Sequence, residues 1–506
     1  MKLLHFKLKD QYKSIDAFDY EFRTITDNFD SFSPICFVGL NGSGKSNIIE
    51  ALSEVFCYLD LFILDYDNTP KWAKISPLSF EIEYILAFTT QTKHIKIECA
   101  VNKKPFFFTI HEDGKLKEEI PSQDLLPSRI IGYSSGHNES ISYSYLKNQG
   151  FYANEVTKIA LSERKKENLP HTLSLFMDYE VNSLILITNY LFKHDTNVFK
   201  NLIRIEQPTS FEINIKLSAP SKRDVVLTPE LDDVINKLKQ AAISSTGDFK
   251  KEWNLYFIIN DSTIEAIQTL FQGPIDFFTS LYKLSLLNSL RLTGSERNFY
   301  TSKLKDDSLK ERAPVVPKEN KVFNIDQLKL QLTIPSIEID YSGLSDGEHQ
   351  FIHIFGTIML FNEPNCLFLL DEPESHFNPN WRSKFIQLAN NVLQNNLSEF
   401  ILSTHSPYVI SSAKKEHVLK FSRQEDKVVY FEPTRETFGA TFEEILEQLF
   451  DIENSISSYS KEYIDNLIVS QDLFKMEEAV SNIANSSVKR FLFQEILRQR
   501  KLQGNK

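Results

Sequence analysis

Cysteine is scarce in this sequence of 506 residues, which holds four cysteines at widely separated positions and no C-x-x-C pair. Closely spaced cysteines mark disulfide frameworks and structural metal sites, so the sequence predicts neither. Most of the four stand in apolar runs; they are Cys36, Cys57, Cys99 and Cys366. We therefore expect buried free thiols and a reducing compartment.

Long hydrophobic runs are also missing. A membrane-spanning helix needs about 18 consecutive apolar residues, and the best candidate, residues 184–192, is short and is interrupted by Thr188 and Asn189. Residues 1–7 lack the apolar core of a secretory signal peptide. By elimination, we expect a cytoplasmic protein without a membrane partner.

Basic charge is in deficit, with 56 Lys and Arg against 68 Asp and Glu and a net charge of −12. Such a chain does not attract nucleic acid through its overall charge, although a local basic groove remains compatible with it. No heptad pattern persists, which argues against a long coiled coil. The hydrophobic fraction of 42% and the charged fraction of 25% are typical of a globular chain, and its length leaves room for two or three domains.

A glycine-rich stretch lies between an apolar run, residues 34–38, and a run with helical periodicity, residues 48–59. These flanks predict a buried strand and a helix. The stretch itself is Gly39-Leu40-Asn41-Gly42-Ser43-Gly44-Lys45-Ser46. Glycines let successive backbone N–H groups turn toward one anion, and a helix N-terminus adds further donors. Because Lys45 can reach the β- and γ-phosphates and the Ser46 hydroxyl can bind Mg²⁺, the stretch predicts a phosphate-binding P-loop.

Two later apolar runs, residues 366–370 and 400–402, also predict buried strands, and each leads into polar residues. Ligands of α/β sheets bind at the carboxyl ends of such strands. We expect Asp371 to hold Mg²⁺, Glu372 to polarise an attacking water, and His405 to donate to the γ-phosphate or to that water.

A further anion site is predicted in the stretch that precedes the first of these two runs. Ser345 and Gly347 precede an apolar helical run, residues 351–361. A hydroxyl and bare N–H groups at the start of a helix suit an anion.

The remaining patterns indicate the domain organisation. Alternating residues before the P-loop and within 78–111 predict an antiparallel sheet, and residues 141–300 are mostly helical with a strand signal at 200–217. A charged, proline-bearing stretch at 301–321 is the best linker candidate. We divide the chain into an N-terminal ATPase lobe with the P-loop, a helical insertion with its linker, a C-terminal ATPase lobe and a C-terminal helical segment, at residues 1–140, 141–321, 322–440 and 441–506.

The ordered set of motifs resembles the ABC-type ATPases, specifically their SMC/RecF-like branch, over roughly residues 1–140 and 322–440. Residues 39–46 are similar to the Walker A motif, 344–348 to the ABC signature, and 367–372 to Walker B with its catalytic Glu. Residues 374–378 take the D-loop position and His405 that of the switch histidine. The resemblance implies an α/β fold: an ABC-type head with a mixed sheet and an antiparallel β-subdomain, interrupted by a largely helical insertion.

Two details depart from the family pattern. The signature has Asp346 in place of Gly and Glu348 in place of Gln, which is similar to non-transport members. The glutamine of the Q-loop has no secure counterpart, and either residues 134–138 or Gln123 would have to serve.

The resemblance also implies that one chain does not complete a site. In this family two heads sandwich two ATP molecules with Mg²⁺, head to tail, so that Ser345 and Gly347 of one protomer close on the ATP held by the P-loop of the other. ATP then joins a homodimer, and hydrolysis releases it, which makes the protein a conformational switch.

Within this branch the outline is most similar to PtuA-type ATPases of Septu and retron antiphage defence systems. Three stretches carry this similarity: residues 133–139, 371–376 and 437–441. It implies a regulatory subunit that controls a separate effector, with an HNH-type nuclease as partner, and with a retron reverse transcriptase and its RNA–DNA product as a further partner.

Three alternatives remain open. An OLD-type protein would carry a Toprim nuclease, but the chain after His405 contains no Asp-x-Asp pattern. A RecF-like DNA clamp would need a basic stripe, for which residues 222–223, 250–251 and 303–310 are the candidates. A scaffold that binds ATP without turnover would not need Glu372.

Overall fold

The computed structural model describes residues 1–27, 29, 32–65, 74–88, 91–135, 141–162, 169, 172–194, 196–218, 224–248, 251–293, 295–296, 314–393, 397–425, 427–452 and 456–504. Its contacts divide the chain into two compact units, Met1–Gly439 and Ala440–Lys506. Each unit is described by itself.

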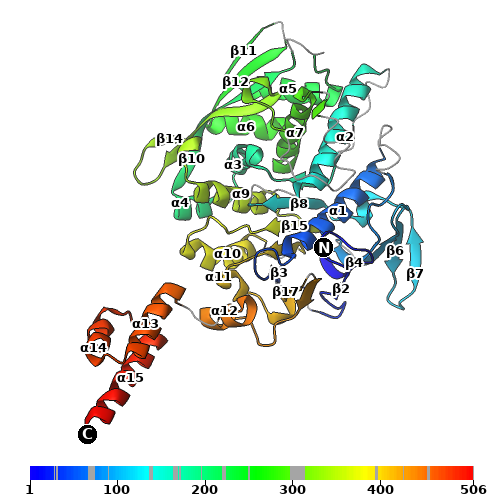
Figure 1. Ribbon diagram of the computed structural model, residues 1–506. Coiled ribbons are helices and arrows are strands. Elements are labelled where there is room, and N and C mark those ends of the chain that lie inside the picture. Colours follow the sequence, from blue (N-terminus) through cyan, green and yellow to red (C-terminus); the bar gives the residue numbers. More distant parts are fainter. Residues whose placement is uncertain are drawn as a thin grey trace. The chain divides into compact units, whose positions relative to one another are not determined.

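A seven-stranded sheet forms the centre of the larger unit, in the order β18-β17-β3-β16-β15-β8-β9 (Figure 1). Neighbouring strands run parallel except at the β17–β18 edge, which is antiparallel. The strands are β3 (Ile35–Val38), β8 (Arg129–Ser134), β9 (Ser174–Phe176), β15 (Cys366–Asp371), β16 (Glu399–Ser403), β17 (Val418–Gln424) and β18 (Lys427–Phe431).

The central strands are short apolar runs because both of their faces are covered. Every residue of β3 and β16 is buried, and so is β15 up to its final residue, Asp371. This is the expected pattern for parallel strands in an α/β sheet. Because these strands are parallel, the residues that follow β3, β15 and β16 meet at one edge of the sheet.

Helix α1 (Lys45–Leu64) packs against this sheet and contacts β8, β15 and β16. One hydrophobic core contains residues of α1, of the seven-stranded sheet and of a second sheet, which explains why α1 is buried along most of its length. The last part of the chain in this unit forms three further helices, which are α9 (Asp346–Leu360), α10 (Pro379–Val392) and α11 (Pro407–Ile410).

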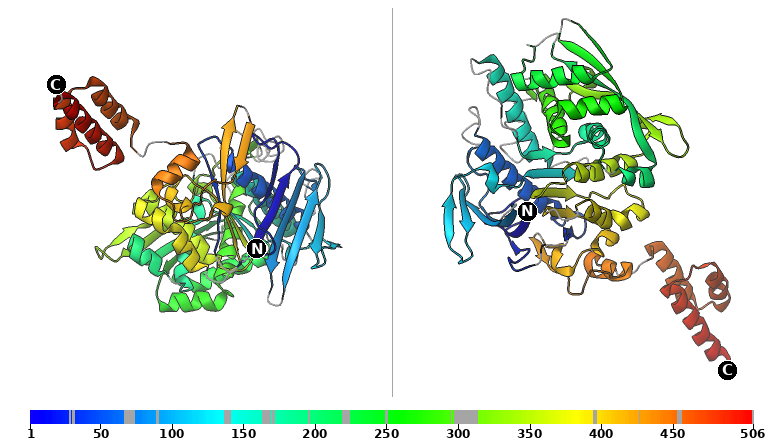
Figure 2. Two further views of the ribbon diagram at one scale, coloured as in Figure 1. Left: turned by 90° about the horizontal axis from the view of Figure 1, so that it is seen from below. Right: turned by 180° about the vertical axis from the view of Figure 1, so that it is seen from behind.

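The second sheet is antiparallel and has six strands in the order β2-β1-β4-β5-β6-β7 (Figure 2, blue and cyan). Apolar side chains on one face join the core, whereas the other face carries charged residues, as expected for a half-exposed sheet. The strands are β1 (Lys2–Leu8), β2 (Phe18–Glu21), β4 (Phe80–Ala87), β5 (Thr92–Cys99), β6 (Phe106–Ile110) and β7 (Leu116–Glu119). The predicted α/β fold with an antiparallel subdomain is confirmed.

The middle of the chain is largely helical, as predicted, and it also contributes to a third sheet. The helices are α2 (Ser142–Leu161), α3 (Asn182–Leu191), α4 (Asn197–Ile203), α5 (Pro229–Ala241), α6 (Asp261–Leu270) and α7 (Pro274–Leu286). Strand β10 (Ile205–Lys216) lies where the strand signal at 200–217 was noted.

This third sheet has five antiparallel strands in the order β11-β12-β10-β13-β14, and the sequence patterns did not predict it as a unit. It pairs β10 with β13 from beyond the predicted linker. Its other strands are β11 (Ser244–Asp248), β12 (Glu252–Ile258), β13 (Phe323–Leu332) and β14 (Glu338–Asp340). Residues 301–313 of the predicted linker lie outside the described residues.

The smaller unit contains α12 (Phe442–Phe450), α13 (Ser458–Ser470), α14 (Leu473–Asn482) and α15 (Ser487–Gly504). The last three helices share a small core, formed by Ile464, Leu467, Met476, Ala479, Leu492 and Ile496.

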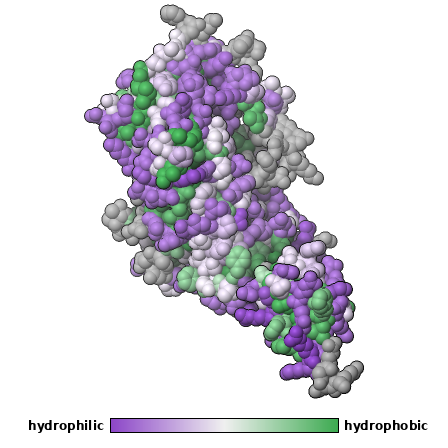
Figure 3. Space-filling model, turned by 90° about the vertical axis from the view of Figure 1, so that its left-hand side faces the viewer, coloured by the Kyte–Doolittle hydropathy of each residue, from purple (hydrophilic) through white to green (hydrophobic). Residues whose placement is uncertain are grey.

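Hydrophobic residues at the protein surface occur in small groups among hydrophilic ones on the face shown in Figure 3. Among the described residues, every helix is too short or too polar to cross a membrane.

Candidate nucleotide site

The P-loop connects β3 to α1 and lies against the hairpin formed by β17 and β18. Gly39 has a φ of 142° and Gly44 a φ of 99°, which side chains rarely adopt. A Cβ on Gly39 would lie 2.2 Å from the backbone oxygen of Phe421, and one on Gly44 would lie 3.0 Å from a methyl of Val428. The backbone angle therefore favours glycine at both positions, and at Gly39 the nearby backbone also leaves no space for a side chain.

Lys45 is the first residue of α1, and its side chain folds back over the loop. Its Nζ donates to the backbone oxygens of Gly39 at 3.0 Å and Leu40 at 3.1 Å, and lies 3.1 Å from Nε2 of His405. Burial lowers the pKa of Lys45, whereas the charges of Glu372 and Asp371 oppose this shift. The ammonium is thus held at the loop by neighbours of opposite charge.

Ser43 gives a direct test of whether this loop fits a phosphate. Its hydroxyl is buried, and among the described residues it has no hydrogen-bond partner. Buried hydroxyls usually have a partner. An orphan donor beside a lysine ammonium and the N-terminus of a helix fits an anion, so the loop suits the phosphates of a nucleotide.

The metal-binding residues predicted from the sequence meet beside the loop. The Ser46 hydroxyl donates to Oδ1 of Asp371 at 2.9 Å, and the Ser403 hydroxyl donates to the same oxygen. Burial raises the pKa of Asp371, and the hydrogen bonds from Ser403 and Ser46 oppose that shift. A hydroxyl next to a carboxylate is the oxygen donor set that Mg²⁺ prefers.

Glu372 and His405 face each other at this edge, with Oε1 and Nε2 3.3 Å apart. Glu372 has a φ of 50°, a strained conformation for a residue with a side chain and one that clusters at functional sites. The hydrogen bond from His405 lowers the pKa of Glu372, and burial opposes it. Because 40% of its side chain is exposed, this carboxylate is accessible to water.

The signature residues lie at the start of α9. Ser345 is its N-cap, and its hydroxyl accepts from the backbone N–H of Glu348 while the Glu348 carboxylate accepts from Ser345. A Cβ on Gly347 would lie 2.8 Å from the backbone oxygen of His376, so glycine permits close packing there. Ser345 is exposed, and the described residues show no hydrogen bond from it or from Gly347 to the P-loop.

The structure therefore brings together Lys45, Ser46, Asp371, Glu372 and His405, with the loop residues Gly39, Leu40, Asn41, Gly42, Ser43 and Gly44. In the part of the chain that the structure describes, no hydrogen bond joins Ser345 or Gly347 directly to this group.

The Q-loop candidates lie at opposite ends of β8. Ser134 pairs with Asp371, and the backbone N–H of Ser135 donates to Asp371, whereas residues 136–138 lie outside the described residues. Gln123 lies in a short 3-10 turn, Gln123–Leu125, which precedes the other end of β8. The assignment of a Q-loop residue stays a prediction.

A family model for the AAA ATPase domain matches residues 20–410. The chain belongs to this family. The match confirms the prediction of an ATPase from the P-loop and its companion motifs.

Relatives of this AAA ATPase-domain protein include a retron ATPase, a phage protein and a Septu protein. The retron Vc95 probable ATPase of Vibrio cholerae serotype O1 biovar El Tor is 24% identical over 232 residues, or 42% of this chain and 40% of that protein. Protein ea59 of Escherichia phage lambda is 24% identical over 178 residues, or 34% and 33%. The Septu protein PtuA of Bacillus thuringiensis is 30% identical over 95 residues, or 18% and 24%. The chain thus matches less than half the length of each relative.

Among solved structures, the SmcHead bound to the C-winged helix domain of ScpA is 13% identical, with a TM-score of 0.35 over 85% of this chain and 98% of that one. The SMC head domain from Thermotoga maritima is also 13% identical, with a TM-score of 0.33 over 85% and 99%. The retron and Septu relatives agree with the resemblance seen in the sequence.

Sequence reasoning missed Ser403 as a partner of Asp371. Ser403 ends β16, and the sheet order places it opposite Asp371 at the end of β15. The sequence does show a serine at the end of a predicted strand. To assign it to Asp371, however, one must know that the two strands are neighbours in the sheet.

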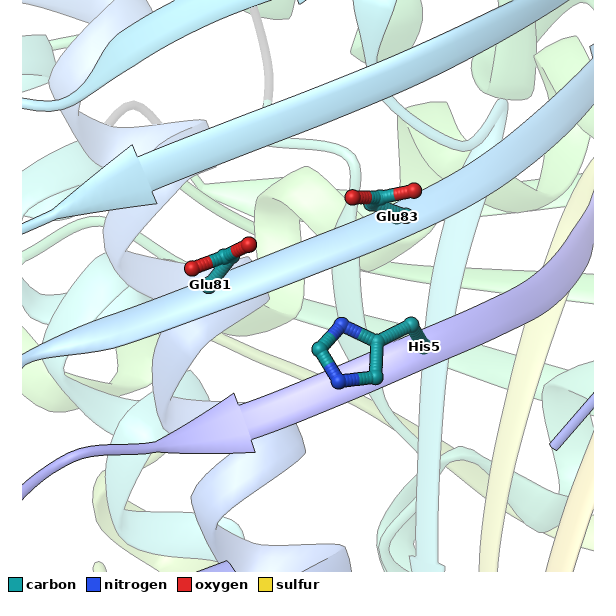
Figure 4. Close-up of side chains that lie close together, drawn as sticks. All are labelled: His5, Glu81 and Glu83. Carbon is teal, nitrogen blue, oxygen red and sulfur yellow. The ribbon is translucent and has the colours of Figure 1, made fainter. Parts of the chain in front are cut away.

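A second group of polar side chains lies on the exposed face of the six-stranded sheet (Figure 4). His5 of β1 and Glu81 and Glu83 of β4 have ligand atoms within 4.8 Å of one another. Nζ of Lys96 already lies 2.6 Å from Glu81 and 3.2 Å from Glu83. Hydrogen bonds from His94 and Lys96 lower the pKa of Glu83, with burial opposing them. Ion pairs from His94 and Lys96 thus join Glu81 and Glu83 of β4 to β5, while His5 pairs with Asp19, and we assign no metal to this group.

The basic residues required by the DNA-clamp alternative are mostly not described. Lys251 is described, while residues 222–223, 250 and 303–310 lie outside the described residues.

Proposed function

We propose that this protein binds ATP with Mg²⁺ at the edge formed by β3, β15 and β16 and hydrolyses it. The observation that carries the proposal is the convergence of Lys45, Ser46, Asp371, Glu372 and His405 from three separated parts of the chain. Strand-end carboxylates are common, but their juxtaposition with a P-loop lysine and an orphan Ser43 hydroxyl fits a nucleotide triphosphate.

Each residue has a role that follows from its position. Lys45, the loop N–H groups and Ser43 hold the phosphates, and Ser46 with Asp371 would hold the metal. When bound, Mg²⁺ supplies Lewis-acid stabilisation of charge on the phosphates. Glu372 accepts the proton of the attacking water, and His405 donates a hydrogen bond to the γ-phosphate or to that water.

We propose further that two copies complete the sites. Ser345 and the N-terminus of α9 are exposed and offer a hydroxyl and helix N–H groups to an anion from outside the chain. A homodimer that sandwiches ATP head to tail would use both surfaces. The Ser345 hydroxyl now donates a hydrogen bond to the Glu348 carboxylate. This carboxylate would have to turn away before the hydroxyl could bind a phosphate.

At the level of the cell, we propose a cytoplasmic switch subunit of an antiphage defence complex. The names of the retron and Septu relatives support this role. The proposed partners are a separate effector nuclease of the HNH type and, in a retron setting, a reverse transcriptase with its RNA–DNA product. Expression of this gene alone should not protect cells from phage, whereas expression with its genomic neighbours should; protection by the single gene would contradict control of a separate effector.

Two substitutions test the ATPase proposal. Lys45→Ala should weaken ATP binding by about 10- to 100-fold, since a hydrogen bond to a charged group contributes about 1.5–3 kcal/mol. Glu372→Gln should leave ATP affinity intact and lower the turnover number by about 100-fold or more, which is the usual contribution of a general base. Titration calorimetry and phosphate release measure the two quantities. Unchanged ATP affinity of Lys45→Ala, or normal turnover by Glu372→Gln, would refute the corresponding role.

A further inference from the structure

Residues 374–376, which follow Glu372, are joined by a hydrogen bond to the loop that carries His405. The Glu374 side chain is buried, and its Oε1 accepts a hydrogen bond from the Thr404 hydroxyl. The same Thr404 oxygen accepts from the backbone N–H of Ser406 at 2.9 Å. Thr404 and Ser406 flank His405 directly, so the Glu374 carboxyl group fixes the backbone on both sides of this histidine.

On its other side the segment is bonded to the signature helix. Gln350, in the second turn of α9 and 5% exposed, donates through Nε2 to the Ser375 hydroxyl at 3.1 Å. Its Oε1 accepts from the backbone N–H of His376 at 2.8 Å, and Nε2 also donates to the Tyr133 hydroxyl at 3.0 Å. The first turn of α9 packs equally closely, because Gly347 leaves no room for a Cβ beside His376.

We propose that Gln350 and Thr404 are positioning residues that join the start of α9 to His405 through residues 374–376. A phosphate bound at the start of α9 would displace or fix that helix, and the Gln350 amide passes the displacement to residues 375 and 376. Glu374 and Thr404 carry it to the loop of His405. The inference rests on the proposed function, and it assigns to one chain the connection between its partner's ATP and its own catalytic histidine.

The geometry of His405 explains why such a link affects the rate. Its Nε2 lies 3.1 Å from Nζ of Lys45 and 3.3 Å from Oε1 of Glu372. A movement of about 1 Å would break both contacts, and misplacements of that size cost about 100-fold in rate. By contrast, Lys45 and Ser46, which would hold the phosphates and the metal, belong to α1, and in the described residues the side chains of Gln350 and Thr404 make no hydrogen bond to that helix.

The first arm of the test replaces Thr404. Thr404→Val removes the hydroxyl and keeps the shape, and we expect ATP hydrolysis to slow by about 10- to 100-fold while the dissociation constant of ATP stays within about twofold. Thr404→Ser should restore the rate, because it restores the hydroxyl. Thr357→Val is the matched control: Thr357 is a buried residue of α9, and among the described residues its hydroxyl donates to the backbone oxygen of His353 in its own helix.

The second arm tests whether both residues act through one connection. Gln350→Met should slow hydrolysis with the same unchanged ATP affinity. The double variant Gln350→Met/Thr404→Val should be no slower than the slower single variant, because effects within one connection are not additive. Rates, ATP affinity and thermal midpoint are measured for every variant.

The outcomes separate the two proposals. Rates within about twofold of the wild type, additive effects, or a slower rate accompanied by weaker ATP binding and a lower thermal midpoint would overturn the positioning role and leave the ATPase standing. A wild-type protein without ATP turnover would overturn the proposed function itself, and the positioning role with it.

Discussion

At the scale of single residues, Glu374 is the clearest case of a side chain whose surroundings change its chemistry. Its carboxyl group is buried, and burial raises its pKa from 4.5 to about 7, although the hydrogen bond from Thr404 opposes the shift. Between these two values the folded chain keeps a proton that the unfolded chain has lost. Stability from this group is therefore highest below pH 4.5 and falls as the pH rises to 7.

Glu374→Gln should remove this pH dependence while keeping the size of the side chain and an acceptor for Thr404. Between pH 4.5 and pH 8 the wild type should lose on the order of 3 kcal/mol of unfolding free energy through this group, as a pKa shift of this size implies. The variant should not show this loss. Urea unfolding at both pH values measures the change. If the difference between variant and wild type is the same at the two pH values, the carboxyl group does not titrate as described.

Single residues also show where sequence reasoning ends. Lys45, Ser46, Asp371 and Glu372 could be proposed because each follows a recognisable run of residues. Ser403 could not be placed, since its role depends on β16 lying between β3 and β15. The order of strands in a sheet comes from packing of the whole fold, and no local pattern encodes it.

At the scale of elements, a buried ion pair joins the N-terminal sheet to the central one. Arg23, just beyond β2, lies 2.5 Å from Oε2 of Glu399 at the start of β16, and their side chains are 1% and 0% exposed. The backbone N–H of Leu3 donates to the same carboxylate at 2.7 Å. The Glu399 carboxylate therefore connects strand β16 to strand β1 and to Arg23.

Glu399→Leu should destabilise the protein by about 3–5 kcal/mol, because it leaves the Arg23 guanidinium buried without its partner. The double variant Arg23→Met/Glu399→Leu should lose much less, since two apolar side chains carry no buried charge. A double-mutant cycle in guanidinium chloride measures the coupling. Additive losses in the two single variants would show that the pair does not act as a unit.

Elements also divide into those that sequence patterns reveal and those that they do not. Strands β3, β15 and β16 were predictable because each is an apolar run buried on both faces. The five-stranded sheet was not, because β10 pairs with β13 from a distant part of the chain. Only the pairing, and not either strand's composition, reveals that sheet.

At the scale of the whole molecule, contacts separate Ala440–Lys506 from the rest of the chain. The division of the larger unit at residues 140 and 321 stays a prediction. The proposed dimer concerns the larger unit alone, because every residue assigned to the nucleotide site, Ser345 and Gly347 included, lies between residues 39 and 405.

The dimer can be tested by combining two inactive variants. Lys45→Ala removes the phosphate grip of the P-loop, and Ser345→Arg blocks the start of α9 with a bulky charge. If one chain holds a complete site, a mixture of the two variants stays inactive. In a head-to-tail dimer, a mixed pair contains one site in which both substitutions fall together and one site that has neither.

We therefore expect equal amounts of the two variants to recover about a quarter of wild-type ATP hydrolysis, since half of the randomly formed dimers are mixed and each of these holds one intact site of two. Each variant alone should be inactive, and a mixture of Lys45→Ala with Glu372→Gln should show no recovery, because both substitutions act on the same protomer's half of a site. Phosphate release after co-expression measures the activity. Recovery in that second mixture, or none in the first, would show that the start of α9 does not complete its partner's site.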